Sequence, residues 1–75
     1  MQTHQFQLRG EFIELHKLLK TEGVCASGGE AKMLVASGEV RVDGAVELRK
    51  ACKIRTGQTV EAGGVRIEVR SAEME

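Results

Sequence analysis

Near its start the chain places apolar side chains with the period of an amphipathic helix. Within residues 11–22 the apolar positions at helical spacing are Phe12, Leu15, Leu18 and Leu19. Gly23 follows directly, and glycine is common just beyond a helix end. The pattern predicts a first helix over residues 11–22, with Phe12 and the three leucines facing the core.

Residues 27–38 carry both a start and a stop signal for a second helix. Ser27 and Glu30 have the capping-box spacing, in which each side chain accepts a hydrogen bond from a backbone N–H that the helix leaves unpaired. Apolar side chains then recur at helical spacing, at Ala31, Leu34 and Val35. Gly38 suits a left-handed helix end. We predict a short helix that begins at about Gly28 and packs against the first one.

The second half of the chain alternates with period two, which is typical of strands. Asp43-Gly44, a dipeptide favoured in tight hairpin turns, separates residues 40–42 from residues 45–47. Further candidate strands cover residues 5–8, 59–61 and 65–69. Two helices followed by a small, mostly antiparallel β-sheet make an α+β fold, and residues 6–8 can pair with that sheet.

Length and composition predict one small domain. The 75 residues allow a single domain, residues 1–75, with a disordered tail expected over residues 71–75. Cys25 and Cys52 form no CxxC pair and have no histidine at ligand spacing, so we expect reduced thiols and neither a metal nor another cofactor. Because no apolar run is long enough to cross a membrane and no signal peptide is visible, the sequence predicts a cytoplasmic protein with no membrane partner.

Charge sums to zero but is unevenly distributed along the chain. Eleven Lys and Arg side chains balance eleven acids, which argues against a protein that coats nucleic acid by bulk charge. Residues 48–55, hereafter the basic run, hold four cations and no acid. Residues 32–55 together hold six cations and three acids. Cations this close repel one another unless a polyanion or a partner compensates them, so the basic run is a candidate binding site.

Few residues could support catalysis. His16 and Cys25 could pair as base and nucleophile, but neither has a third orienting group at a recognisable spacing, and so short a chain has little room for a substrate cavity. Gly28-Gly29 at a helix start can present N–H groups to a phosphate together with Lys32, although the Walker lysine pattern is missing. The sequence therefore predicts a protein that is not an enzyme, and it favours contacts with nucleic-acid phosphates over nucleotide binding.

The chain is poor in aromatic residues. Only Phe6 and Phe12 are aromatic, and the helical pattern assigns Phe12 to the core. Proteins that read single strands stack unpaired bases on exposed aromatic rings, which we do not expect here. The remaining option is recognition of a folded RNA by its backbone shape, through cations and backbone donors on a rigid surface.

These features together resemble the RNA-binding domain named after the fourth protein of the small ribosomal subunit, also called the αL motif. The residues that match the pattern of that family are Leu15, Leu18, Leu19, Gly23, Ser27, Ala31, Gly38, Val40, Val42, Asp43, Gly44 and Gly57-Gln58. The resemblance covers about residues 11–62 and is strongest to small stand-alone bacterial members. Two departures occur. Gly28-Gly29 stands where the family usually has an arginine after the serine, and Asp43 replaces the usual Asn, although both suit that turn.

The resemblance implies a two-helix αL motif packed on a small, mostly antiparallel β-sheet. It also implies non-catalytic binding of structured RNA, either ribosomal or transfer RNA, in an accessory role in translation or ribosome assembly, with ribosome-associated proteins as further partners. Carried over position by position and combined with the charge distribution, it points to these RNA-binding residues: Arg9, Lys32, Arg41, Arg49, Lys50, Lys53 and Arg55. Each of them could instead be ordinary solvated surface.

Three other functions stay open on the sequence. A protein-interaction adaptor could keep the fold without RNA binding, and an exposed apolar patch at Met33 and Val24, with the basic run neutralised by Glu47 or Glu61, would favour it. Specific DNA binding in the manner of helix-turn-helix proteins is disfavoured, because residues 28–37 offer almost no long polar side chains to read base edges. A small thiol enzyme ranks last.

Overall fold

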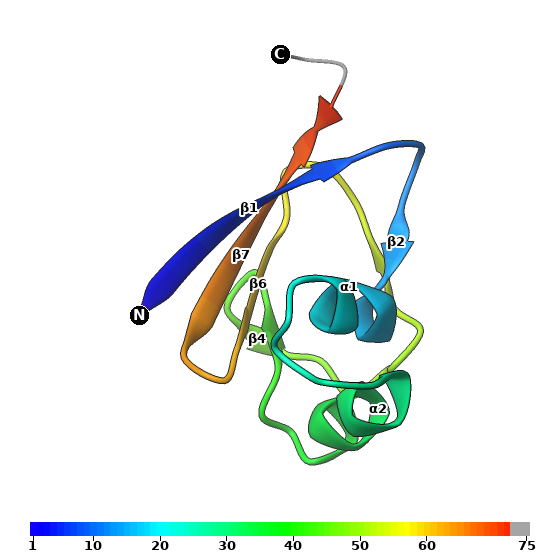
Figure 1. The fold of residues 1–75 in the computed structure, drawn as a ribbon, viewed down its shortest axis with the longest axis vertical. Coiled ribbons are helices and arrows are strands. Elements are labelled where there is room, and N and C mark those ends of the chain that lie inside the picture. Colours follow the sequence, from blue (N-terminus) through cyan, green and yellow to red (C-terminus); the bar gives the residue numbers. More distant parts are fainter. Residues whose placement is uncertain (73–75) are drawn as a thin grey trace.

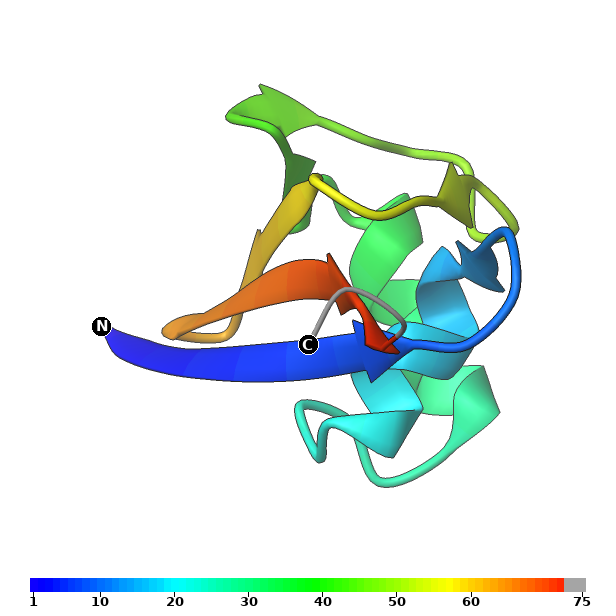
Figure 2. The same ribbon diagram turned by 90° about the horizontal axis from the view of Figure 1, so that it is seen from above.

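Two helices lie beside a small sheet in the computed structural model, which describes residues 1–72 (Figure 1). The elements in chain order are β1 (Gln2–Leu8), β2 (Ile13–Glu14), α1 (Leu15–Thr21), α2 (Gly28–Ala36), β3 (Arg41–Val42), β4 (Ala45–Val46), β5 (Lys53–Ile54), β6 (Thr59–Ala62) and β7 (Val65–Ser71). Viewed from above, both helices stay on one side of the sheet (Figure 2). The predicted α+β class is confirmed.

The main sheet has the strand order β1-β7-β6-β3-β4. All its pairs are antiparallel except β1 with β7, which run parallel from the register Gln2↔Val65 to Leu8↔Ser71. The predicted edge strand at residues 5–8 is therefore longer than expected. Ser71, where the disordered tail was predicted to begin, is the last residue of β7, and residues 73–75 of that tail lie outside the described residues.

The first helix begins later than the apolar spacing predicted. Residues 13–14 form β2, which pairs antiparallel with β5 in a separate two-stranded sheet, and α1 starts only at Leu15. Phe12, which precedes β2, is 39% exposed, so its assignment to the core was wrong. The extended β2 backbone removes Phe12 from the helical face that carries Leu15, Leu18 and Leu19 into the core.

The second helix begins and ends as predicted. The Ser27 hydroxyl oxygen accepts a hydrogen bond from the N–H of Glu30 at 3.1 Å. The Glu30 carboxylate reaches back and accepts a hydrogen bond from the N–H of Ala26, also at 3.1 Å. Gly38, just beyond the helix, has φ +83°, the left-handed conformation that glycine adopts without strain. The predicted hairpin also forms, since Asp43 (φ +52°) and Gly44 (φ +86°) both take the positive φ of a type I′ turn.

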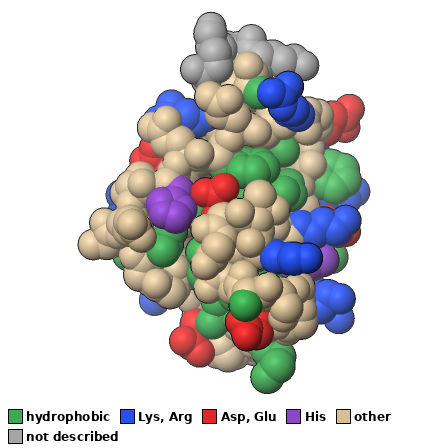
Figure 3. All heavy atoms as spheres, in the orientation of Figure 1, with side chains coloured by type: hydrophobic (Ala, Val, Ile, Leu, Met, Phe, Trp, Pro, Cys, Tyr) green, Lys and Arg blue, Asp and Glu red, His purple; other side chains and the backbone are tan. Residues whose placement is uncertain are grey.

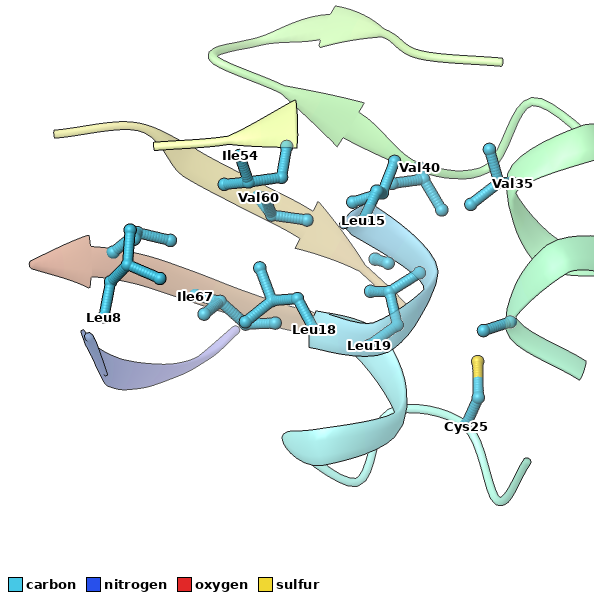
Figure 4. Packing of buried hydrophobic residues seen from close by; sticks show 13 residues of the cluster. Leu8, Leu15, Leu18, Leu19, Cys25, Val35, Val40, Ile54, Val60 and Ile67 are labelled. Atoms are coloured by element: carbon cyan, nitrogen blue, oxygen red, sulfur yellow. The ribbon is translucent and has the colours of Figure 1, made fainter. Parts of the chain in front are cut away.

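The core lies between the helix pair and the sheet. Its buried side chains are Leu8, Leu15, Leu18, Leu19, Cys25, Ala31, Val35, Val40, Ile54, Val60, Ala62, Ile67 and Val69. Figure 4 shows α1 as the central element, with leucines directed at the sheet and towards α2. Leu34 and Val42 are partly buried and pack against it. This packing holds α1, β2 and β5 in fixed positions, and those elements support the candidate site.

Candidate nucleic-acid interface

The basic run is attached by its backbone to the start of α1. Glu14, the residue that precedes the helix, makes no side-chain capping hydrogen bond. Instead, the N–H of Leu15 donates to the carbonyl of Cys52 at 2.9 Å, and the N–H of His16 donates to the carbonyl of Lys50 at 3.0 Å. The loop therefore satisfies two N–H groups that a helix start leaves unpaired, and this fixes Lys50 beside α1.

Two cations of the basic run lie over an aromatic ring. Pairing of β2 with β5 places Ile13 opposite Ile54, so Phe12 lies close to the residues on either side of Ile54. The ammonium nitrogen of Lys53 is 4.9 Å from the centroid of the Phe12 ring, and the guanidinium carbon of Arg55 is 5.8 Å from it. Both distances are within the range of cation–π attraction.

Lys17 adds a further charge to the same part of the molecule. Its ammonium nitrogen is 3.3 Å from a carboxylate oxygen of Glu14, and Nε2 of His16 lies 3.5 Å from that same oxygen. Glu14 is paired in register with Lys53 across the β2–β5 sheet. We call the group Lys17, Lys50, Lys53 and Arg55 the cationic face. Lys and Arg side chains also gather in Figure 3 on the side where Figure 1 shows β2 and α1.

Arg49, although it belongs to the basic run, is paired with an acid. Its guanidinium donates two hydrogen bonds to the Glu47 carboxylate, from Nε at 2.9 Å and from Nη2 at 3.2 Å. Its backbone N–H donates a third, at 2.9 Å. These bonds lower the pKa of Glu47 from 4.5 to about 2, so the carboxylate stays ionised beside Arg49. Arg49 is thus partly neutralised by Glu47, one of the two acids named for this role from the sequence.

The other three predicted site residues are not joined to the cationic face. Within residues 1–72, no hydrogen bond or ion pair connects Arg9, Lys32 or Arg41 to it. Arg41 donates a long hydrogen bond of 3.4 Å to the carbonyl of Gly44 at its own hairpin. Lys32 is exposed on α2, and Arg9 is exposed just after β1. These three assignments remain predictions.

Sequence reasoning missed Phe12, His16 and Lys17 as neighbours of the basic run. Phe12 was placed in the core, His16 was considered only as a possible base for Cys25, and Lys17 was given no role. The sequence could have indicated Lys17, because Glu14 and Lys17 are three residues apart, a spacing at which opposite charges pair on one face of a helix. Nothing in the local sequence indicates that the start of α1 would meet residues 50–55, since that contact depends on the β2–β5 pairing.

The two thiols are free in the structure. Burial raises the pKa of Cys25, and the nearby Glu30 carboxylate raises it further. Burial and Glu47 likewise raise the pKa of Cys52. A thiol with a raised pKa is protonated at neutral pH and is a poor nucleophile or metal ligand. Among residues 1–72, no group of three His, Cys, Asp or Glu side chains could hold a metal ion, and neither helix is long and apolar enough to cross a membrane.

Comparison with known proteins gives consistent matches. YbcJ of Escherichia coli is 54% identical over 57 residues, which are 76% of this chain and 81% of that protein, and the protein of the same name from Shigella flexneri matches to the same extent. The solution structure of Escherichia coli YbcJ is described as revealing an αL motif involved in RNA binding. It superposes on this protein with a TM-score of 0.65 at 46% sequence identity, and the match covers 95% of this chain and 89% of that one.

A longer protein also contains a related segment. Tyrosine–tRNA ligase of Ralstonia nicotianae is 37% identical over 62 residues, which are 83% of this chain but 16% of the ligase, so the domain also occurs within an enzyme. The model of the S4 domain family matches residues 6–70. With most of the chain matched by that model and by YbcJ, the chain belongs to the S4 domain family, as its resemblance to the αL motif predicted.

Proposed function

We propose that this protein binds structured RNA, ribosomal or transfer RNA, through the cationic face. The observation that carries this proposal is the convergence of Lys17, Lys50, Lys53 and Arg55 beside the start of α1. Only Lys17 of the four has an ion pair with an acid among residues 1–72. Exposed cations without acidic partners are suited to phosphate oxygens, which fix the position of a protein on a folded RNA.

Membership of the S4 domain family and the similarity to YbcJ support RNA as the ligand. The protein acts without catalysis, as an accessory factor in translation or ribosome assembly in the cytoplasm, and it meets ribosome-associated proteins on its RNA target. With about four to six phosphate contacts, its affinity is moderate and falls steeply as salt rises. Arg9, Lys32 and Arg41 supply the outer contacts of the RNA.

The test is RNA binding by a double variant, Lys50→Gln with Lys53→Gln, across a salt series. Each lost phosphate contact reduces the slope of log affinity against log salt by about 0.7–0.9, so the double variant is expected to lose about 1.4–1.8. The control, Arg66→Gln with Arg70→Gln, removes the same charge from β7, where both arginines pair with acids. Equal losses in the two variants would mean that bulk charge, not the cationic face, binds the RNA.

A groove on α2 favours a second candidate function, protein interaction without RNA. It has a volume of about 450 Å³, and its lining includes Val24, Cys25, Met33 and Leu34 together with Glu30 and Glu39. Met33 is 74% exposed, as an adaptor with an apolar patch requires. If the wild-type protein retains no cellular RNA even at low salt, this function replaces the first. Met33→Asp would then abolish capture of the protein partner, while Lys50→Gln would leave it unchanged.

A further inference from the structure

Phe12 is an exposed aromatic ring on a rigid support. The residue is 39% exposed. The residue after it, Ile13, is paired with Ile54, which is fully buried in the core. The backbone that carries the ring is therefore held by the core, and the ring does not lie on a loose terminus. An exposed phenylalanine in a chain with only two aromatic residues is a candidate for contact with a ligand.

Lys53 and Arg55 surround this ring with positive charge. They flank Ile54 in sequence, so the alternation of a strand directs both side chains away from the core and to the same side. Their charged groups lie 4.9 and 5.8 Å from the ring centroid, and neither has an acidic partner among residues 1–72. Because the cations lie over the ring, a base that stacks there displaces at least one of them from the ring face, and the displaced cation is then available to the neighbouring phosphate.

We propose that Phe12, Lys53 and Arg55 form a stacking site for one unpaired base of the RNA, with the two cations on its flanking phosphates. This inference rests on the proposed function and specifies its ligand as an RNA helix interrupted by a bulged or looped-out nucleotide. An uninterrupted duplex keeps its bases stacked on one another and can offer only its backbone to this surface. A bulged base is already free to leave the helix, so little unstacking opposes its transfer to Phe12.

The experiment compares two RNA hairpins that differ only in one bulged 2-aminopurine nucleotide. The wild-type protein is expected to bind the bulged hairpin about tenfold more tightly, which is the scale of stacking one base on an aromatic side chain. Its binding also changes the 2-aminopurine fluorescence, because the base leaves its RNA neighbours for the ring. Phe12→Leu keeps an apolar side chain but removes the π face, so both the preference and the fluorescence change are lost, whereas the uninterrupted hairpin is still bound. Phe12→Tyr retains both.

The outcomes separate this inference from the proposed function. Equal wild-type affinity for the two hairpins, or a bulge preference that survives Phe12→Leu, overturns the stacking site and leaves RNA binding by the cationic face intact. Absence of wild-type binding to either hairpin at low salt overturns both. Far-UV circular dichroism of the Phe12→Leu protein establishes that it is folded, and its affinity for the uninterrupted hairpin gives a second check that does not depend on stacking.

Discussion

The side chain of Asp43 accepts a hydrogen bond from the backbone N–H of Thr59, at 2.9 Å and across 16 residues of sequence. Its second carboxylate oxygen accepts a hydrogen bond from Nε2 of Gln58 at 3.2 Å, and its own N–H donates to the carbonyl of Thr59 at 2.8 Å. Asp43 also has φ +52° in the turn. One residue thus shapes the β3–β4 hairpin and ties it to the start of β6.

Asp43→Ala is therefore expected to destabilise the protein by about 2–4 kcal/mol, because it removes the acceptor of two donors and also the polar side chain that lets Asp or Asn adopt the left-handed region more easily than Ala. Asp43→Asn keeps an acceptor oxygen for Thr59 and tolerates that conformation, so its cost is about 1 kcal/mol or less. Urea unfolding followed by far-UV circular dichroism measures both values. If the Asn variant is as unstable as the Ala variant, then neither the acceptor oxygen for Thr59 nor the tolerance of a positive φ explains the stability that Asp43 contributes.

Stability should depend on pH through Glu47. Hydrogen bonds from Arg49 hold the pKa of Glu47 at about 2 in the folded protein, against an ordinary value of 4.5. A carboxylate that is more acidic in the folded state favours folding when it is ionised, and this contribution is lost as the pH falls from 4.5 through 2. At neutral pH the wild-type protein is thus expected to have a larger free energy of unfolding than the Glu47→Gln variant. The difference between the two should shrink as the pH falls from 4.5 to about 2.

The direct measurement of this pKa is an NMR titration of the Glu47 carboxyl carbon, with an expected midpoint of about 2. A midpoint near 4.5 would show that Arg49 does not hold the carboxylate in solution. The pH dependence of the difference between the two proteins would then have another origin.

If Arg49 contacts RNA as the sequence predicts, Glu47 competes with the RNA for it. Glu47→Gln is expected to raise RNA affinity by up to about fivefold, since exposed ion pairs contribute roughly 0.2–1 kcal/mol and Arg49 becomes free to contact a phosphate. The matched control is Glu61→Gln, which releases Arg66 on the start of β7 with the same change in charge. An equal gain for both variants would assign the effect to net charge alone.

Local signals in the sequence predicted the local structure correctly. Ser27 and Glu30 cap α2, and Asp43-Gly44 forms the hairpin turn, because the groups that decide these features lie within a few residues of one another. The predicted start of the first helix was wrong because its position depends on residues far away in the sequence. Ile13 pairs with Ile54, and the hydrogen-bond acceptor of Leu15 is Cys52, partners that no window around residues 11–22 contains.

The candidate site was likewise predictable from the sequence only in part. The charge of the basic run is visible in the sequence, but its attachment beside Lys17 and the exposure of Phe12 both follow from the β2–β5 pairing. Arg49 and Glu47 are two positions apart, and Glu47 was already named from the sequence as an acid that could neutralise the basic run. Long-range contacts, not composition, decide which cations lie together.

Gly28 occupies the first position of α2, where the family pattern usually has an arginine after the serine. Nothing lies within 4 Å of the position that a Cβ would take there, so the protein has room for a longer side chain. A cation at this position would stand beside the N–H groups of the helix start, close in sequence to Lys32. The departure from the family pattern therefore has a direct test.

Gly28→Arg is expected to raise RNA affinity and to steepen the slope of log affinity against log salt by about 0.7–0.9, the effect of one added phosphate contact. Gly28→Ala is the matched control, because it replaces the same glycine without adding a charge. Filter binding of a structured RNA across a salt series measures both slopes. If the Arg and Ala variants bind alike, the start of α2 does not face the RNA, and the interface is confined to the cationic face beside α1.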